Sequence, residues 1–303
     1  MAELQTALNS IESSIRDRNP AVSIGMPVYN GAEYIREALD SLLGQTCSDF
    51  ELIISDNAST DATQSICEEY ARRDPRVRYV RQSENKGAAA NFRFVLDCAK
   101  ADLFMWAAYD DLWAPNYLMD ATALLTDKAI DFVFPTFELR SIRLRISKTI
   151  EPERFRFIES PDRRWRVLHF MALHYLSHSA NIVYSLFRTR FLRAAWKKQD
   201  IGNDGALGAI VLSDGRGIMS NSLFSKRYRM VWPSMLPPVF SVVKGWVGKR
   251  DVTSEAQRSI DTARLKMLSL FPEYEREITF IFNRYRPHEH DRSYRVCSID
   301  ELF

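Results

Sequence analysis

The chain has 303 residues, 46% of them hydrophobic, so it is long enough for one large core or two smaller ones. Its 41 basic and 39 acidic side chains give a net charge of +2, which excludes the strongly basic composition of typical nucleic-acid-binding proteins. Four cysteines without a CxxC pair fit neither a zinc site nor a disulfide framework, so we expect a reduced, cytoplasmic protein. The sequence has no run of about 18 apolar residues, so we expect no transmembrane helix.

From residue 21 to 139, short apolar runs of β type alternate with amphipathic helical patterns. Strands are expected at 21–30, 50–56, 77–82, 102–108 and 130–139, and helices at 31–45, 61–74, 87–100 and 114–127. Beyond residue 139 we expect helices at 162–177, 204–215, 254–271 and 273–286 and a strand at 181–189. The alternation predicts an α/β fold with a mostly parallel central sheet and helices on both faces.

Polar side chains follow three of the expected strands. Tyr29 and Asn30 end the first strand, Asp56 and Asn57 end the second, and Asp110 and Asp111 follow the fourth. Sheets of this kind bind ligands at the carboxyl ends of their strands. We therefore expect these side chains to meet at one edge of the sheet.

The two adjacent carboxylates, Asp110 and Asp111, have two interpretations. The GxGxxG and GxxxxGK[ST] phosphate-binding loops are both absent, so a bound nucleotide would need another source of positive charge. Mg²⁺ supplies it when one or two carboxylates bind the ion together with substrate phosphates. Alternatively, Asp111 caps the helix that opens near Pro115. Both roles are compatible.

Asp56 and Tyr29 suggest how the rest of a nucleotide would be held. Asp56 lies too early to cap the next helix, and its carboxylate can accept a hydrogen bond from a base N–H or a ribose hydroxyl. Tyr29 either packs in the core or stacks on a nucleobase, an interaction of about 1–3 kcal/mol. His174 and His178 have the i,i+4 spacing of metal ligands, but no acidic or cysteine ligand lies nearby, so a surface or acceptor-cleft position is favoured.

The stretch from about residue 21 to 229 resembles the family 2 glycosyltransferases, which are inverting enzymes of the GT-A fold. The segments that carry the resemblance are VSIGMPVYNGAEYIREALDSLLGQT, ELIISDNASTDAT, NKGAAANF, WAAYDDLWAPNYL and GNDGALGAIVLSDGRG. It implies a GT-A catalytic domain at 21–231, with a nucleotide-sugar half at 21–139 and an acceptor half at 140–231. Helical extensions are then expected at 1–20 and 232–303.

The resemblance also implies the roles of individual residues. Asp204 is the expected catalytic base, Asp110 and Asp111 are the expected ligands of Mg²⁺ or Mn²⁺, and Trp113 and His178 are expected on the acceptor side. The donor is expected to contact Pro27, Tyr29, Asp56, Asn57, Lys86 and Asp110. One departure bears on the metal: Ala108 stands where the first Asp of the family's Asp-x-Asp motif is common. Strict metal dependence is therefore an open question.

The expected function is transfer of a sugar, with inversion, from a nucleotide-sugar to an acceptor hydroxyl in synthesis of a bacterial-type surface polysaccharide or glycoconjugate. A UDP-sugar is favoured as donor, and a glycan or lipid-linked glycan as acceptor. The alternatives are a sugar-1-phosphate nucleotidyltransferase and a non-catalytic nucleotide-sugar or glycan-binding protein. The segment around Trp232, Phe240 and Trp246 suits either peripheral contact with the cytoplasmic face of a membrane or packing within the protein or a homo-oligomer.

Overall fold

The computed structural model describes residues 19–141, 146–150, 152–177, 182–198, 204–228 and 264–284. The first 18 residues of the predicted N-terminal extension lie outside these ranges. Most of the predicted C-terminal extension, 232–263 and 285–303, lies outside them as well, together with the aromatic segment around Trp232, Phe240 and Trp246.

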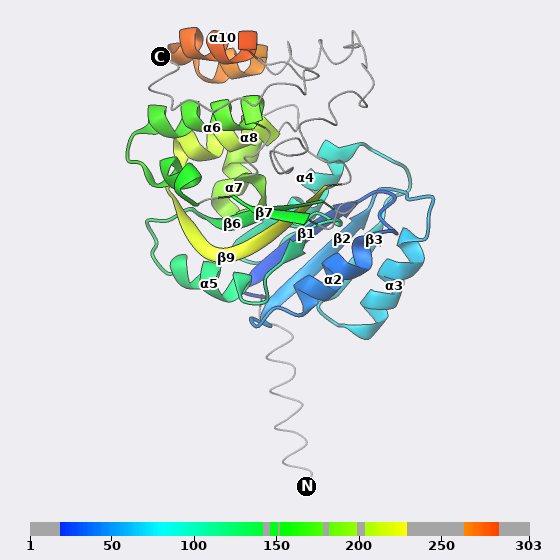
Figure 1. The fold of residues 1–303 in the computed structure, drawn as a ribbon. Coiled ribbons are helices and arrows are strands. Elements are labelled where there is room, and N and C mark those ends of the chain that lie inside the picture. The colour runs from blue at the N-terminus through cyan, green and yellow to red at the C-terminus, as the bar shows by residue number, and fades with distance from the viewer. Residues whose placement is uncertain are drawn as a thin grey trace.

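A nine-stranded sheet forms the centre of the described part, with the order β3-β2-β1-β4-β8-β6-β9-β5 and with β7 beside β6 (Figure 1). The four strands of its N-terminal half are all parallel to one another. They are β1 (Val22–Val28), β2 (Phe50–Asp56), β3 (Val77–Arg81) and β4 (Leu103–Trp106). All seven residues of β1 are buried, as expected for a strand with helices on both faces.

The other half of the sheet is mixed rather than parallel. Here β8 pairs antiparallel with both β4 and β6, β6 pairs parallel with β9, and β5 and β7 add antiparallel neighbours. The bounds are β5 (Leu112–Trp113), β6 (Phe132–Ser141), β7 (Ile146–Thr149), β8 (Leu186–Arg188) and β9 (Gly217–Tyr228). The predicted parallel arrangement therefore holds for the first half only. The long curved strand β9, visible in Figure 1, was not predicted.

The described α-helices agree closely with the predicted ones, except for α7, which was not predicted. They are α2 (Ile35–Leu43), α3 (Thr63–Arg73), α4 (Ala88–Cys98), α5 (Tyr117–Leu124), α6 (Arg163–Ser177), α7 (Thr189–Lys197), α8 (Asp204–Asp214) and α10 (Glu275–Arg284). Short 3₁₀ helices are η1 (Pro152–Glu159), η2 (Ile182–Tyr184) and η5 (Pro272–Tyr274). The strand predicted at 181–189 is wrong in its first half, because residues 182–184 form η2 and only three residues join the sheet as β8.

The chain order of the parallel strands creates a crevice. Strands β1, β2 and β3 run outward in sequence, and the chain then returns to place β4 on the other side of β1. Because such connections are right-handed, α2 and α3 cover one face and α4 covers the other. The strand order reverses between β1 and β4, and ligands bind at the carboxyl ends of strands at such a point.

Helix α8 is buried on all sides, which fixes the position of its first residue, Asp204. Residues 205–213 are all buried, and the helix packs against α6 and α7. Gly208 permits the close approach of α6, because a Cβ there would lie 2.2 Å from the ring of Phe170. In Figure 1, α6 lies between α8 and α10 in a stack of helices beside the curved strand β9.

Candidate active site

The loops that follow β1 and β4 touch across the crevice. A Cβ added to Gly31 would lie 2.7 Å from the ring of Tyr109, so only glycine lets the two loops approach this closely. Tyr29 and Asn30 belong to the first loop, and Asp110 and Asp111 belong to the second. The structure thus places these two predicted groups of polar residues on either side of the crevice.

Asp56 is a fully buried carboxylate at the end of β2, and its oxygens already have partners. Oδ1 accepts a hydrogen bond from the Ser59 N–H at 2.8 Å. Oδ2 accepts from the Tyr79 hydroxyl at 2.8 Å and forms an ion pair of 2.8 Å with Arg81. A base or ribose would reach Asp56 only through the remaining acceptor capacity of its oxygens or after a small movement. The role predicted for Asp56 stays a prediction.

Arg81 was missed in the sequence. It is the last residue of β3, and its guanidinium donates to Asp56 and to the Ser59 carbonyl at 3.0 Å. The Arg81 side chain is 35% exposed, so it lies between the buried Asp56 carboxylate and the solvent at the edge of the sheet. Arg81 could have been predicted from its position at the end of the third strand, because the polar residues at the ends of the first, second and fourth strands were selected in the same way.

Asn57 organises the loop that carries Lys86. Its side-chain amide donates to Asn85 Oδ1 at 2.7 Å and to the Gly87 carbonyl at 3.2 Å, and its Oδ1 accepts from the Lys86 N–H at 3.0 Å. Asn57 is buried, whereas Lys86 is exposed. Asn57 therefore fixes the position of this loop, and the Lys86 side chain is exposed on it. The donor-binding roles expected for both residues stay predictions.

Tyr29 and Pro27 differ in what they can offer a ligand. Tyr29 is 43% exposed directly after β1, which leaves part of its ring available for stacking. Pro27 is buried within β1, opposite Ser55 of β2. Tyr29 is therefore the better candidate for direct contact, and the donor contact expected for Pro27 stays a prediction.

Asp111 is tied to β9 and not to α5. Its Oδ1 accepts a hydrogen bond of 2.8 Å from the Arg227 N–H, whereas the residue at the N-cap of α5 is Asn116. The interpretation of Asp111 as a helix cap is therefore wrong. Asp111 is 2% exposed, and this burial raises the pKa of its carboxyl to about 7, with the charge of Lys226 opposing the shift and that of Asp110 adding to it.

Lys226 brings together the two halves of the predicted site. Burial lowers the pKa of the Lys226 ammonium below its usual value, and the carboxylates of Asp111, Asp204 and Asp110 oppose this shift. Asp204 is exposed at the first turn of α8. It therefore lies within electrostatic range of the same lysine as Asp110 and Asp111, which are more than 90 positions earlier in the sequence. No sequence pattern singled out Lys226, because β9 itself was not predicted.

The residues of this edge fit a divalent ion only if the ligand supplies part of its coordination. In the described ranges, no three aspartate, glutamate, histidine or cysteine side chains gather into a metal site. Asp110 is partly exposed, whereas Asp111 has one oxygen on Arg227 and position 108 is alanine. A site built on Asp110 and completed by phosphate oxygens agrees with the way Mg²⁺ is usually held.

The predicted acceptor-side residues receive no support from their positions. Trp113 is 3% exposed and packs on Phe224 at 5.2 Å between ring centroids, and its indole N–H has no hydrogen-bond partner among the described residues. Contact with an acceptor would require Trp113 to become exposed. His178 lies outside the described residues.

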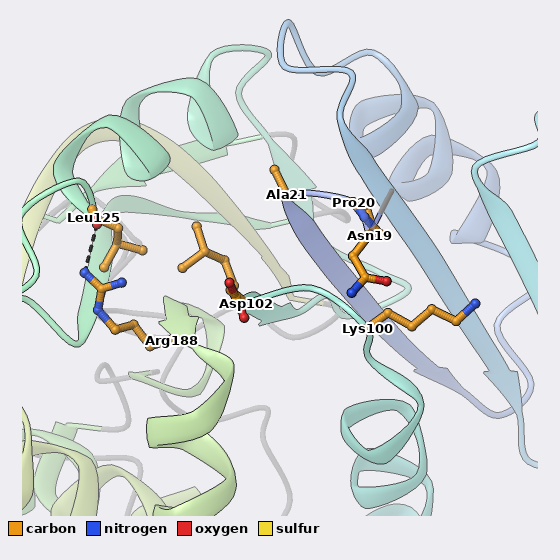
Figure 2. A pocket seen from close by; sticks show the side chains of 8 residues that line it. Asn19, Pro20, Ala21, Lys100, Asp102, Leu125 and Arg188 are labelled. Atoms are coloured by element: carbon orange, nitrogen blue, oxygen red, sulfur yellow. Dashed lines mark hydrogen bonds between the residues drawn. The ribbon is translucent and has the colours of Figure 1, made fainter. Parts of the chain in front are cut away.

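A separate pocket lies at the opposite edge of the sheet. Figure 2 shows Lys100 and Asp102, which precede β4, together with Ala21, which precedes β1, and Arg188 at the end of β8. Arg188 donates there to the Leu125 carbonyl at 2.9 Å. Because this pocket lies at the amino ends of the parallel strands, it is distinct from the crevice that carries the predicted site.

The family model described as Glycosyl transferase family 2 matches residues 23–196, which is more than half of the chain. The chain therefore belongs to glycosyl transferase family 2. This match runs through β1 to α7 and includes the crevice between β1 and β4.

Relatives and solved structures agree with this assignment. An uncharacterized glycosyltransferase of Rickettsia typhi is 30% identical over 54% of this chain and 50% of its own length. Bacillus subtilis TuaG, named for teichuronic acid biosynthesis, is 32% identical over 40% of this chain and 48% of its own length. The chain spans about half the length of these curated relatives.

Two solved structures share the fold. S. aureus TarS 1–349 in complex with UDP-GlcNAc has a TM-score of 0.57 and 17% identity, with 87% of this chain and 71% of that chain covered. The mannosyltransferase PcManGT from Pyrobaculum calidifontis, in complex with GDP-Man and Mn²⁺, has a TM-score of 0.52 and 18% identity, with 87% and 69% covered. The predicted GT-A fold is confirmed. None of the described helices has the length and apolar character to span a bilayer.

Proposed function

We propose that this protein is an inverting glycosyltransferase that moves a sugar from a nucleotide-sugar to a hydroxyl group of a glycan or lipid-linked glycan. One observation carries the proposal. The polar side chains that follow β1, β2, β3 and β4 lie at a single edge of the sheet, and Asp204 shares Lys226 with the carboxylates of that edge. A donor site and a base within one charged cluster are what sugar transfer requires.

The donor would bind across the parallel half of the sheet. Tyr29 would stack on the base, the Asp56–Arg81 pair would contact the base or ribose, and Asp110 would lie near the diphosphate. A carboxylate and a guanidinium side by side can accept from a base N–H and donate to a base carbonyl, which suits the edge of uracil. The TarS complex with UDP-GlcNAc agrees with a UDP-sugar, while PcManGT holds GDP-Man.

The transfer itself is a displacement at the anomeric carbon. The acceptor oxygen forms a bond to that carbon as the bond to the diphosphate oxygen breaks and leaves its electron pair on the diphosphate. Asp204 takes the proton of the acceptor hydroxyl, and attack from the side opposite the diphosphate inverts the carbon. When bound, Mg²⁺ or Mn²⁺ on Asp110 would stabilise the negative charge of the departing diphosphate.

The names of two relatives support a proposal for the biological setting. TuaG is named for teichuronic acid biosynthesis, and Bacillus subtilis EpsH, another glycosyltransferase, is 39% identical over 98 residues. We infer a role in synthesis of a bacterial surface polysaccharide at the cytoplasmic face of the membrane. Peripheral membrane contact and a homo-oligomer remain proposals, because the aromatic segment at 232–246 lies outside the described residues.

One observation favours a second candidate, a non-catalytic nucleotide-sugar-binding protein. Ala108 removes a carboxylate from the metal site of the family's motif, and loss of metal would weaken catalysis more than binding. A sugar-1-phosphate nucleotidyltransferase has less support, since the turn after β1, PVYNGAEY, lacks the glycine-rich, arginine-containing loop such an enzyme would need.

A panel of nucleotide-sugars tests the proposal without knowledge of the acceptor. The protein is incubated with UDP- and GDP-sugars in the presence of Mn²⁺, and release of the nucleoside diphosphate is measured. A transferase is expected to hydrolyse its own donor slowly, with water in place of the acceptor. Binding of a nucleotide-sugar without release of nucleotide by any donor would favour the non-catalytic alternative.

A further inference from the structure

Lys226 projects from β9 toward the face of the sheet on which η2 lies. Side chains alternate along a strand, so Lys226 and Arg227 point to opposite faces. The Arg227 guanidinium lies near α2, where it donates to the Tyr34 carbonyl at 3.3 Å and forms an ion pair with Glu37. On the other face, Lys226 Nζ lies 5.8 Å from the centroid of the Tyr184 ring in η2.

Lys226 follows Ser225, which pairs with Leu112, and the next residue, Arg227, donates its N–H to Asp111 Oδ1, so Lys226 lies beside the two carboxylates that follow β4. Tyr184, whose ring its ammonium faces, belongs to η2, which packs against α8. Asp110 and Asp111 follow β4, and Asp204 begins α8. In the proposed reaction, Asp110 lies on the side of the diphosphate and Asp204 on the side of the acceptor. The bond that breaks lies between these two sides. Lys226 lies between the loop after β4 and η2, which places its ammonium on the side of the diphosphate oxygen that receives the electron pair.

We propose that Lys226 is a protein cation for the donor diphosphate and supplies part of the charge that a fully ligated metal would otherwise supply. The inference rests on the proposed function. Ala108 leaves the metal site with one carboxylate fewer, and the chain has a lysine beside the remaining two. A lysine ammonium is a compact charge that binds phosphate well.

A purely structural role for Lys226 is the competing explanation. The ammonium would then only offset the charge of the half-enclosed carboxylates, and its loss would disturb the whole crevice. The two explanations differ in what they predict for ligands with and without phosphate. If Lys226 contacts the diphosphate, its substitution lowers the affinity for UDP and leaves the affinity for uridine unchanged. If the substitution disturbs the whole crevice, it lowers both affinities.

Calorimetry in metal-free buffer with EDTA separates the two roles. Wild type is expected to bind UDP more tightly than uridine without metal, and GDP and guanosine form the second pair of probes. Lys226→Met is expected to lower UDP affinity about tenfold or more, the range of one charged hydrogen bond, while uridine affinity stays the same. Lys226→Arg keeps the charge and should retain most of the difference between UDP and uridine.

Two controls complete the design. Lys100→Met removes the same charge from an exposed side chain at the opposite edge of the sheet and should change neither affinity. Thermal unfolding of each variant shows whether it is folded, and Lys226→Gln replaces Lys226→Met if the latter is not. Added Mn²⁺ should recover part of the UDP affinity lost in Lys226→Met.

The outcomes distinguish this inference from the proposed function. Unchanged UDP affinity in Lys226→Met, or an equal loss for UDP and uridine, would overturn the inference. So would a wild type that prefers UDP over uridine, and GDP over guanosine, only when Mn²⁺ is present, although the proposed function would then stand. A wild type that binds none of the four probes under either condition would contradict both.

Discussion

Asp111 Oδ1 accepts a hydrogen bond of 2.8 Å from the backbone N–H of Arg227, and this bond joins the loop after β4 to the end of β9. The Arg227 guanidinium adds hydrogen bonds to the Asp110 carbonyl and to Glu37 of α2. The protein itself therefore holds the Asp111 carboxylate and the Asp110 backbone in place. A ligand or ion entering the crevice meets an acidic loop that is already positioned.

The first prediction concerns this hydrogen bond. Asp111→Ala should lower the free energy of unfolding by about 1–3 kcal/mol, because the buried Arg227 N–H loses its acceptor. Asp111→Asn keeps an oxygen at the same place and should lose less. Urea denaturation of the two variants measures the difference. Equal destabilisation would mean that the charge of Asp111, and not its acceptor oxygen, matters to the fold.

The second prediction concerns Asp110, the partly exposed carboxylate of the pair. Asp110→Asn should leave the melting temperature nearly unchanged and reduce donor hydrolysis severely, because a neutral amide is a weaker metal ligand than a carboxylate. The rate is measured across a titration of Mn²⁺, and the loss should be largest when the metal is limiting. Wild-type rates for Asp110→Asn at low Mn²⁺ would remove Asp110 from the metal site.

Tyr29 offers a test of where the base binds. Tyr29→Ala should weaken nucleotide binding about five- to over a hundredfold, because a stacking ring contributes about 1–3 kcal/mol. Tyr29→Phe keeps the ring and serves as the matched control with near-wild-type affinity. Calorimetry with the nucleoside diphosphate gives both values. If Tyr29→Ala binds as tightly as Tyr29→Phe, the base lies elsewhere.

The ion pair between Arg81 and Asp56 leads to a prediction about stability and binding together. Arg81→Met leaves the fully buried Asp56 carboxylate without its cation, so the melting temperature and the nucleotide affinity should both fall. Arg93→Met is the control, since Arg93 and Asp97 form an exposed i,i+4 pair on α4 whose loss should have little effect. Similar melting temperatures for the two variants would show that Asp56 does not need Arg81.

The sequence predicted the parallel half of the fold well, because each of its strands is a short apolar run followed by an amphipathic helix. The burial of Ile35, Ala38, Leu39 and Leu42 along α2 follows directly from their helical spacing. The convergence of Tyr29, Asp56 and Asp110 was also predictable, since the carboxyl ends of parallel strands share one edge.

The mixed half of the sheet depends on pairings that local patterns do not specify. Strand β9 carries polar residues at many positions, including Asn221, Ser225 and Lys226, and its partner β6 lies more than 80 residues earlier. Lys226 and the Asp111–Arg227 bond belong to this strand and could not be found without it. Arg81 is different, because its place at the end of an expected strand made it accessible to the same reasoning as Asp56.

Asp204 carries the central claim, that the described edge of the sheet is a catalytic site and not only a binding site. Asp204→Asn preserves the polar side chain at the start of α8 but cannot accept a proton, so the helix should form normally. The measurement is the rate of nucleotide release from the preferred donor, together with donor affinity, for wild type and Asp204→Asn. We predict a rate about 10² to 10⁴ times lower with unchanged affinity, the usual effect of losing a general base. A near-wild-type rate for Asp204→Asn would contradict the account and assign the proton transfer to another residue, with Asp214 and Asp200 the next to be tested.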